Sequence, residues 1–182
     1  KSGRDPLDVY QELKDLGIQD ISMEVVGDAD EMIKEGAGLH DTFGDCCTVK
    51  VPCSPDGLRT CKHLSDLNVR VNVTLIFSQT QAILAAKAGA TYVSPFVGRV
   101  DDNSFGGICL VKDIVNVFRE HFIQTQVLAA SIRNVRDVGR LFEHGSEIVT
   151  MPPAVFEKMY NHILTDKGLE LFQADWESVH NT

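Results

Sequence analysis

Short apolar, β-branched runs alternate with longer amphipathic segments along the whole chain of 182 residues. The period of two residues in the runs and of about 3.6 in the segments predicts strands that alternate with helices. The strand-like runs are 20–26, 46–52, 69–77, 91–97, 126–132 and 147–151. The helix-like segments are 6–16, 28–35, 56–67, 79–88, 111–122, 135–141 and 153–163. Strands separated by helices cannot pair as hairpins, so we expect a parallel sheet with right-handed crossovers.

The polar residues inside the runs distinguish a closed barrel from an open sheet. An open sheet carries helices on both faces, and its strands are almost continuously hydrophobic. In a barrel one face of each strand lines a lumen, where polar groups can meet near the C-terminal strand ends. The polar residues that share one parity within their runs are Ser22, Glu24, Thr48, Lys50, Asn72, Thr74, Ser131 and Arg133. The opposite, apolar parity includes Leu75 in the third run and Ala130 and Ile132 in the fifth. We therefore expect a TIM (β/α)8 barrel.

The number of strands is smaller than such a barrel needs. A (β/α)8 barrel has eight strands and about 250 residues, whereas six strand-like runs are recognisable here. We expect that the first two barrel strands are absent from this stretch of sequence. No linker divides the chain, so residues 1–182 are expected to form one domain with strands three to eight and a C-terminal helix. Phe172 and Trp176, four residues apart, predict that this last helix is amphipathic and packs on a barrel.

Local signals mark several helix boundaries. The tripeptide Ser-Pro-Asp at 54–56 is a typical helix start. Gly17, Gly89 and Gly145 stand where the end of a helix needs a left-handed residue. The one long connection is expected at 98–107.

Composition argues against several functional classes. The net charge of −9 and the lack of a Lys/Arg-rich run argue against a nucleic-acid partner. The apolar runs are shorter than the roughly 18 residues of a membrane span, and residues 1–10 lack the apolar region of a signal peptide. We therefore expect a cytoplasmic protein with no membrane partner. The five cysteines form no C-x-x-C pair and the six histidines no i, i+4 pair, which predicts buried thiols and no metal site.

Lys50 is the one lysine of nine that interrupts a strand-like run, within CCTVKVPC. An apolar lumen disfavours a charged ammonium and makes the neutral amine available as a nucleophile. The alternative is a structural lysine paired with a carboxylate such as Glu24.

Two arginines follow strand-like runs, and a serine precedes each of them on its run. Arg99 follows Ser94 in SPFVGR, and Arg133 follows Ser131 in AASIRN. A guanidinium binds phosphate oxygens through two parallel hydrogen bonds, and hydroxyl groups can complete the site. Either arginine alone is typical of a surface salt bridge, but both of them together with a buried lysine favour a phosphate clamp.

Glu24, Asn72 and Thr74 complete the predicted lumen. A carboxylate and a hydroxyl can hold a water molecule that shuttles protons during dehydration of a carbinolamine, and an amide can bind a substrate hydroxyl. The alternative is that these polar groups only satisfy one another.

The segments ISMEV, TVKVP, NVTLIFS, YVSPFVGR and AASIRN resemble successive strands of the transaldolase family, in particular its small subfamily that includes the fructose 6-phosphate aldolases. The resemblance continues through LTDKGLELFQADWESV. It implies that Lys50 is the Schiff-base lysine, that Glu24 and Thr74 hold the catalytic water, and that Asn72 binds a substrate hydroxyl. The phosphate-binding positions that it implies are Ser94, Arg99, Ser131 and Arg133.

Two positions distinguish the branches of this family. The aldolases tend to have glutamine at the position of Glu24 and tyrosine at that of the substrate-binding Phe96, whereas this chain agrees with the transaldolases. The resemblance therefore implies a pentose phosphate pathway enzyme without cofactor. Such an enzyme moves a dihydroxyacetone unit from sedoheptulose 7-phosphate or fructose 6-phosphate to glyceraldehyde 3-phosphate or erythrose 4-phosphate. The open alternatives are an aldolase that releases dihydroxyacetone and a non-catalytic barrel that binds sugar phosphates.

The resemblance also implies features outside the present segments. The family has an acid/base aspartate on its first strand and a Thr-Thr-Asn-Pro motif on its second, and neither is present in these 182 residues. We expect the aspartate upstream of Lys1. The resemblance further implies a ring-forming homo-oligomer in which the C-terminal helix covers a neighbouring subunit.

Overall fold

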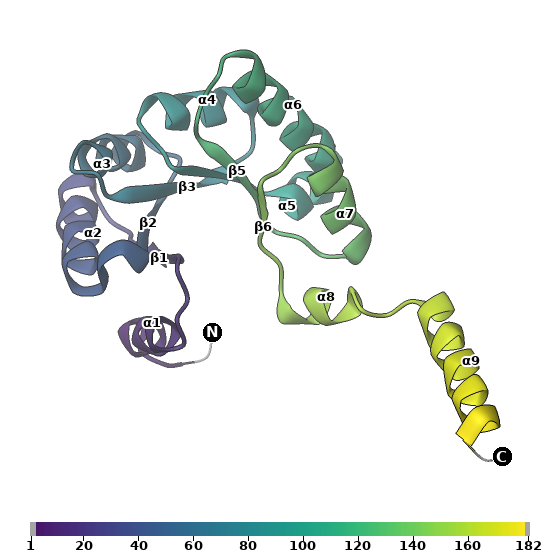
Figure 1. Ribbon diagram of the computed structural model, residues 1–182. Helices are drawn as coiled ribbons and strands as arrows, with labels where there is room; N and C mark the ends of the chain where they lie inside the picture. Colours follow the sequence, from purple (N-terminus) through teal and green to yellow (C-terminus); the bar gives the residue numbers. More distant parts are fainter. Residues whose placement is uncertain (1–2, 181–182) are drawn as a thin grey trace.

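A computed structural model describes residues 3–180, which form a curved sheet of six parallel strands with helices on its convex side (Figure 1). The strands are β1 (Ile21–Glu24), β2 (Cys47–Pro52), β3 (Arg70–Ile76), β4 (Tyr92–Pro95), β5 (Gln126–Ala129) and β6 (Ile148–Val149). They are hydrogen-bonded in chain order, and every neighbouring pair is parallel. The predicted barrel-type α/β fold is therefore confirmed. Within residues 3–180 the edge strands β1 and β6 do not pair with each other, so the sheet is an arc.

Four of the helices that follow strands start at side-chain caps. Ser54, Ser78 and Asn134 each accept a hydrogen bond from the backbone N–H three residues further on. Asp28 and Glu31 form a reciprocal capping box at the start of α2. The helices are α1 (Pro6–Asp15), α2 (Ala29–Phe43), α3 (Pro55–Asp66), α4 (Gln79–Lys87), α5 (Val97–Asp102), α6 (Gly107–Glu120), α7 (Val135–Glu143), α8 (Pro153–Lys158) and α9 (Ile163–His180), with a short 3-10 helix, η1 (Gly44–Cys46).

The structure confirms three of the predicted helix ends and corrects other helix boundaries. Gly17, Gly89 and Gly145 have φ values of 81, 93 and 89°, which confirms these three stop signals. The connection predicted at 98–107 instead contains most of α5 and the first residue of α6. The predicted end of α2 at residue 35 is wrong, because the helix continues through Gly36 and Gly38 to Phe43.

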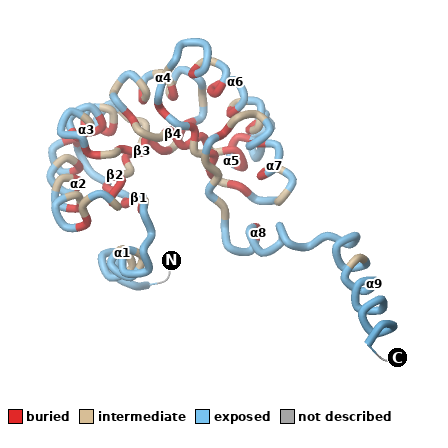
Figure 2. Tube along the Cα trace, viewed as in Figure 1, coloured by how far each residue is buried: buried red, intermediate tan, exposed pale blue. Residues whose placement is uncertain are grey.

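The core lies between the convex face of the sheet and the helices that cover it (Figure 2). Val49, Val71 and Val73 are fully buried there. Gly36 lets α2 approach the sheet, because a Cβ at this position would lie 2.9 Å from Leu64 Cδ1 and 3.0 Å from Val49 Cγ1. The convex face is therefore tightly packed.

Strand β3 departs from simple alternation at Leu75. This residue has a φ of 60°, and the β3–β4 register shifts between Val73 and Ile76. The extra residue of such a bulge lets Thr74 line the concave pocket while Ile76 is fully buried in the core. The prediction that Leu75 occupies the apolar face is wrong, since Leu75 is only partly buried and Ile76 takes the core position.

The parity predicted for the fifth run is confirmed for Ile132, which belongs to the core, and is wrong for Ala130. Val127 and Ala129 belong to the core, whereas Leu128 and Ala130 line the concave pocket. Strand β5 ends at Ala129, and Ser131 has a left-handed backbone with a φ of 61°. Ser131 therefore reaches the pocket through a turn of the backbone and not through strand alternation.

Beyond β6 the chain leaves the sheet, and α9 extends away from it (Figure 1). None of the described residues of α9 is buried. Phe172 and Trp176 lie on this helix as predicted, and their exposed fractions are 72% and 62%. The predicted packing of this helix on a barrel is not seen within the described part of the chain. Within residues 3–180 no helix has the length and apolar content needed to cross a membrane.

Candidate active site

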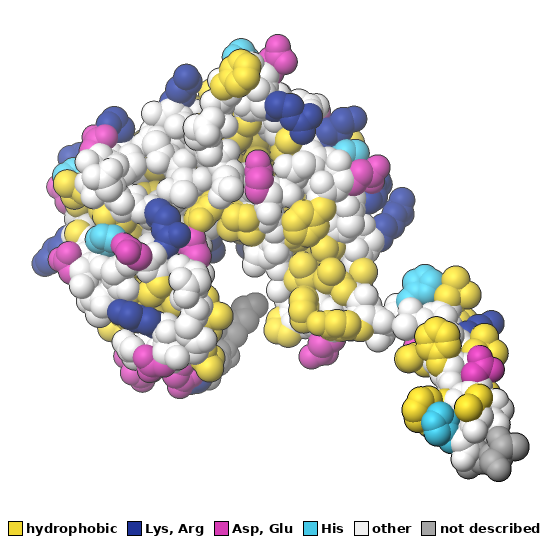
Figure 3. All heavy atoms as spheres, viewed as in Figure 1, with side chains coloured by type: hydrophobic (Ala, Val, Ile, Leu, Met, Phe, Trp, Pro, Cys, Tyr) yellow, Lys and Arg dark blue, Asp and Glu magenta, His cyan; other side chains and the backbone are white. Residues whose placement is uncertain are grey.

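A pocket of about 380 Å³ lies on the concave face of the sheet, toward the C-terminal ends of the strands. It is lined by Ser22, Lys50, Asn72, Thr74, Ser94, Phe96, Leu128, Ala130, Ser131 and Thr150. Six of the nine predicted site residues are among them. A second pocket of about 790 Å³ continues from it along the concave face. In the space-filling view the molecule is hollowed between α1 and α8, and apolar side chains gather on the α8 side (Figure 3).

Four lining residues were not predicted as site residues. Ser22 shares the parity of Glu24, and Thr150 directly follows β6, so both carried a usable signal in the sequence. Leu128 and Ala130 were missed because apolar side chains in a strand carry no functional signal. The polar lining comes from different strands, as expected for a barrel-type site.

Lys50, which lines this pocket, forms an ion pair with Glu24, which lies outside its lining. They are register partners on β2 and β1, and Lys50 Nζ lies 2.9 Å from Glu24 Oε2. The exposed fractions of the two side chains are 25% and 55%. This contact is the one that the structural alternative predicted, but it also places a proton acceptor beside the amine of a pocket residue.

Asn72 is held in one orientation by two serines. Ser94 Oγ donates to Asn72 Oδ1 at 2.7 Å, and Asn72 Nδ2 donates to Ser22 Oγ at 3.2 Å. Asn72 and Ser94 are each 2% exposed. In this structure the Ser94 hydroxyl therefore orients the amide of Asn72, and the role of Ser94 in phosphate binding stays a prediction.

Thr74 carries a buried hydroxyl, Oγ1, without a hydrogen-bond partner among the described residues. An unpaired buried hydroxyl costs about 1–3 kcal/mol, and such groups usually bind water or a ligand. Because Thr74 lines the same pocket as Lys50, this hydroxyl marks a position for a bound water or a substrate hydroxyl.

Phe96 connects the pocket to Arg99. The ring of Phe96 lies edge-on to that of Phe77, with centroids 5.8 Å apart. The guanidinium carbon of Arg99 lies 4.9 Å from the centroid of Phe96, within the range of a cation–π contact. No ion pair of Arg99 is found among residues 3–180, so the salt-bridge alternative does not describe Arg99 in this part of the chain.

Arg133 is held against helix α5. Both carboxylate oxygens of Asp102 accept hydrogen bonds from its guanidinium, which is the salt bridge that the alternative predicted for this arginine. Gly98 N–H donates to Ser131 O at 3.1 Å, and a Cβ on Gly98 would lie 2.7 Å from Arg133 Nε. A glycine is therefore required where α5 meets the segment that carries Ser131 and Arg133.

Below the pocket a cluster of polar side chains joins the N-terminal ends of the strands. Asp20 Oδ2 accepts from Arg70 Nη1 at 2.8 Å and from Tyr92 OH at 2.7 Å. Asp20 Oδ1 accepts from Thr48 Oγ1 at 2.7 Å. Burial and the hydrogen bond to Asp20 raise the pKa of Tyr92. Because the polar groups of this cluster bind one another, its role is structural: it connects the strands below the site.

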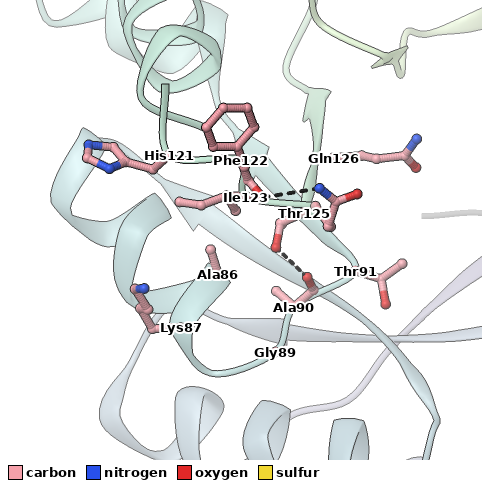
Figure 4. A pocket seen from close by; sticks show the side chains of 11 residues that line it. Ala86, Lys87, Gly89, Ala90, Thr91, His121, Phe122, Ile123, Thr125 and Gln126 are labelled. Atoms are coloured by element: carbon pink, nitrogen blue, oxygen red, sulfur yellow. Dashed lines mark hydrogen bonds between the residues drawn. The ribbon is translucent and has the colours of Figure 1, made fainter. Parts of the chain in front are cut away.

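A pocket of about 610 Å³ lies at the opposite, N-terminal side of β4 and β5 (Figure 4). Two of its polar side chains are already paired, because Thr125 Oγ1 donates to Ala90 O at 2.7 Å and Gln124 Nε2 donates to Phe122 O at 3.1 Å. It contains none of the predicted site residues. Residues on this side of such barrels usually serve stability, so the concave pocket is the better candidate.

The cysteines are free thiols in different environments. Burial raises the pKa of Cys61 to about 12 and that of Cys47 to about 11, which makes both thiols unreactive. The prediction of buried thiols is wrong for Cys109, which is exposed. Residues 3–180 contain no group of three or more His, Cys, Asp or Glu side chains that could hold a metal ion.

Comparison with protein families gives a match over almost the whole chain. The model described as transaldolase/fructose-6-phosphate aldolase matches residues 7–182. A protein of Cereibacter sphaeroides named "probable transaldolase" is 50% identical over 183 residues, which cover 100% of this chain and 83% of the relative. Proteins with the same name from Paracoccus denitrificans and Caulobacter vibrioides are 51% and 48% identical. They match 97% and 98% of this chain, and 81% and 82% of their own lengths.

Solved structures with lower sequence identity support the fold alone. A mandelate oxidase variant with 2-hydroxy-phenylacetamide matches 78% of this chain and 51% of its own, with a TM-score of 0.59 and 14% identity. A GMP reductase variant from Trypanosoma brucei in complex with guanosine 5'-monophosphate matches 75% of this chain and 30% of its own. Its TM-score is 0.58, at 17% identity.

Proposed function

Because the chain belongs to the transaldolase/fructose-6-phosphate aldolase family, we propose that it is a transaldolase that moves a dihydroxyacetone unit between sugar phosphates. The nucleophile in this proposal is Lys50. The observation that carries the proposal is the amine of Lys50 at the pocket wall, 2.9 Å from the carboxylate of Glu24 and in one pocket with the unpaired hydroxyl of Thr74.

The first steps make a Schiff base. Glu24 takes a proton from the Lys50 ammonium, and the free amine attacks the carbonyl carbon of the ketose. A proton then passes from the nitrogen to the former carbonyl oxygen, which gives the carbinolamine. The carboxyl group of Glu24 protonates the hydroxyl of the carbinolamine, which leaves as water and forms the iminium. A water molecule held between Glu24 and the free hydroxyl of Thr74 would relay these protons, which gives that unpaired hydroxyl a function.

The next step breaks the bond between C3 and C4 of the ketose. The electron pair of this bond moves into the iminium and forms an enamine, while a base takes the proton of the C4 hydroxyl and an aldose phosphate leaves. In this proposal the base is the aspartate that the family resemblance places upstream of Lys1. Attack of the enamine on a second aldose phosphate reverses these steps and gives a new ketose.

Binding groups around the pocket orient the substrate. Asn72, fixed by Ser94, presents its amide to a substrate hydroxyl. Arg99, Ser131 and Arg133 bind the phosphate in this proposal, which is supported by the close contact of Gly98, the neighbour of Arg99, with the 131–133 segment. A fixed phosphate lets donor and acceptor sugars bind in the same register, which lowers the entropic part of the barrier.

Phe96 favours a transaldolase over an aldolase that releases dihydroxyacetone. Release requires that the enamine on Lys50 is protonated before an acceptor aldehyde arrives. At the position of Phe96 the pocket wall is an apolar ring packed between Phe77 and Arg99, without a hydroxyl that could donate this proton. The enamine therefore persists until the acceptor binds.

Trapping with borohydride tests the proposal. The folded protein, treated with fructose 6-phosphate and borohydride, should gain the mass of a reduced dihydroxyacetone adduct. Lys50→Ala should give no adduct and lose activity on the order of 10³-fold or more, whereas Lys87→Ala, at the opposite end of the sheet, should behave like the wild type. A folded wild-type protein without an adduct would exclude the Schiff base. Dihydroxyacetone release in the absence of an acceptor would instead identify an aldolase.

A further inference from the structure

The guanidinium of Arg133 is occupied by a carboxylate of the same chain. Asp102, the last residue of α5, accepts hydrogen bonds from Nη1 and Nη2 of Arg133 with its two oxygens. A guanidinium binds a phosphate with the same bidentate geometry. The side chains of Arg133 and Asp102 are 53% and 48% exposed, so an anion from solvent can reach the pair.

Asp101, the neighbouring carboxylate, has a different function. Its Oδ1 accepts a hydrogen bond from Gly107 N–H at 2.8 Å, which fixes the start of α6. Asp102 takes no part in that contact. The two adjacent aspartates thus differ in function: Asp101 has a structural contact, whereas Asp102 faces an arginine of the site.

The two arginines of the site also differ from each other. Arg99 stacks on Phe96. Within residues 3–180 its guanidinium donates no hydrogen bond to another residue. Arg133, in contrast, has its outer edge filled by Asp102. Hydrogen bonds from Arg133 lower the pKa of Asp102, so this carboxylate stays ionised at neutral pH.

We propose that Asp102 is an internal competitor of the substrate phosphate and thereby a specificity-determining residue. This inference rests on the proposed function, in which Arg133 is a phosphate ligand. In the empty pocket Asp102 holds Arg133, and a phosphate binds by replacing the carboxylate. A phosphate with a charge of about −1.5 to −2 and three acceptor oxygens can displace a carboxylate of charge −1. A sugar without phosphate leaves the Asp102–Arg133 pair intact.

Asp102 should therefore lower the affinity for phosphorylated sugars and leave that for unphosphorylated sugars unchanged, so it should reduce the discrimination between the two. Its effect depends on Arg133, because the carboxylate competes for that side chain. A carboxylate that merely stabilised α5 would change the stability of the protein and not its affinity for phosphate.

Titration of the full chain with inorganic phosphate in a calorimeter tests this inference. Asp102→Asn should bind phosphate about fivefold more tightly than the wild type. The matched control is Asp101→Asn, which removes the same charge one residue away and keeps an oxygen for Gly107 N–H. This control should change the dissociation constant less than about twofold. In steady-state assays Asp102→Asn should lower the KM for fructose 6-phosphate without raising kcat.

Three results would overturn the inference: equal tightening in both asparagine variants, no tightening in Asp102→Asn, or unchanged phosphate binding in Arg133→Gln. The double variant Asp102→Asn/Arg133→Gln should bind phosphate like Arg133→Gln alone. Borohydride trapping of the same proteins separates the two proposals. An adduct on Lys50 without tighter phosphate binding contradicts only the competition, whereas no adduct contradicts the proposed function and leaves the phosphate titration to decide the competition.

Discussion

The two faces of the sheet divide stability and chemistry between neighbouring residues. On the convex face Val49 and Val73 are fully buried against the helices. On the concave face Lys50 and Asn72, one residue away from them in sequence, line an open pocket. Since successive side chains of a strand point to opposite faces, one short strand supplies both core residues and pocket residues. The two faces should therefore respond differently to substitution, and this difference can be measured.

The largest expected effect is on the convex side. Leu64 of α3 is fully buried, so Leu64→Ala should lower the free energy of unfolding by about 2–5 kcal/mol through lost burial and a cavity. Activity per folded molecule should change little. Urea unfolding and kcat measure these quantities. Leu84→Ala on α4, where the side chain is 56% exposed, is the control and should cost less than about 0.5 kcal/mol. Equal losses in both variants would contradict the assignment of the core.

The second effect is on the concave side and has the opposite pattern. Thr74→Val removes the unpaired buried hydroxyl and keeps the shape of the side chain. The free energy of unfolding should stay equal or rise by about 1 kcal/mol, while kcat should fall about 100-fold through loss of the proton-relaying water. Thr74→Ser keeps a hydroxyl and should retain most of the activity. A fully active Thr74→Val variant would show that this hydroxyl has no role in the reaction.

A smaller effect compares two glycines of one helix. A Cβ on Gly36 would press against Leu64 and Val49, whereas a Cβ on Gly38 meets nothing within 4 Å. Gly36→Ala should destabilise the protein by about 1–3 kcal/mol through overpacking. Gly38→Ala should stabilise it by about 0.5–1 kcal/mol because alanine is the better helix former. Thermal and urea unfolding report both values, and the same sign for both variants would mean that α2 is less closely packed than described.

The smallest effect concerns thiol reactivity and leaves the fold unchanged. Cys109 is exposed, whereas Cys61 is buried with its pKa raised to about 12. A thiol with a raised pKa forms its reactive thiolate only at higher pH, so Cys61 should resist iodoacetamide at pH 8 while Cys109 is alkylated. Mass spectrometry of the peptides distinguishes the two. Rapid labelling of Cys61 in the native protein would indicate local opening of α3.

Local patterns in the sequence were sufficient for the strands and for much of the concave face. Alternation within a strand depends only on the period of two residues, so Glu24, Lys50 and Asn72 could be assigned to one face without the structure. The capping serines, such as Ser54 and Ser78, are also local signals.

The features that sequence missed depend on distant contacts or on short elements. Helix α5 could not be predicted from the sequence, because its six residues are too few for a periodic pattern and Phe96 provides no side-chain cap. Asp102 lies 31 residues before Arg133, and their contact exists only because α5 packs beside the end of β5. The cluster around Asp20 joins residues as far apart as Tyr92, 72 positions later in the chain.

The bulge at Leu75 has a consequence for how related sequences are aligned. Because the extra residue resets the alternation, a chain that lacks one residue at this position would still direct Thr74 to the concave side and an apolar residue to the core. A deletion at Val71 would instead turn part of β3 onto the wrong face. A one-residue gap opposite position 75 is therefore compatible with an unchanged site, whereas a gap opposite position 71 is not.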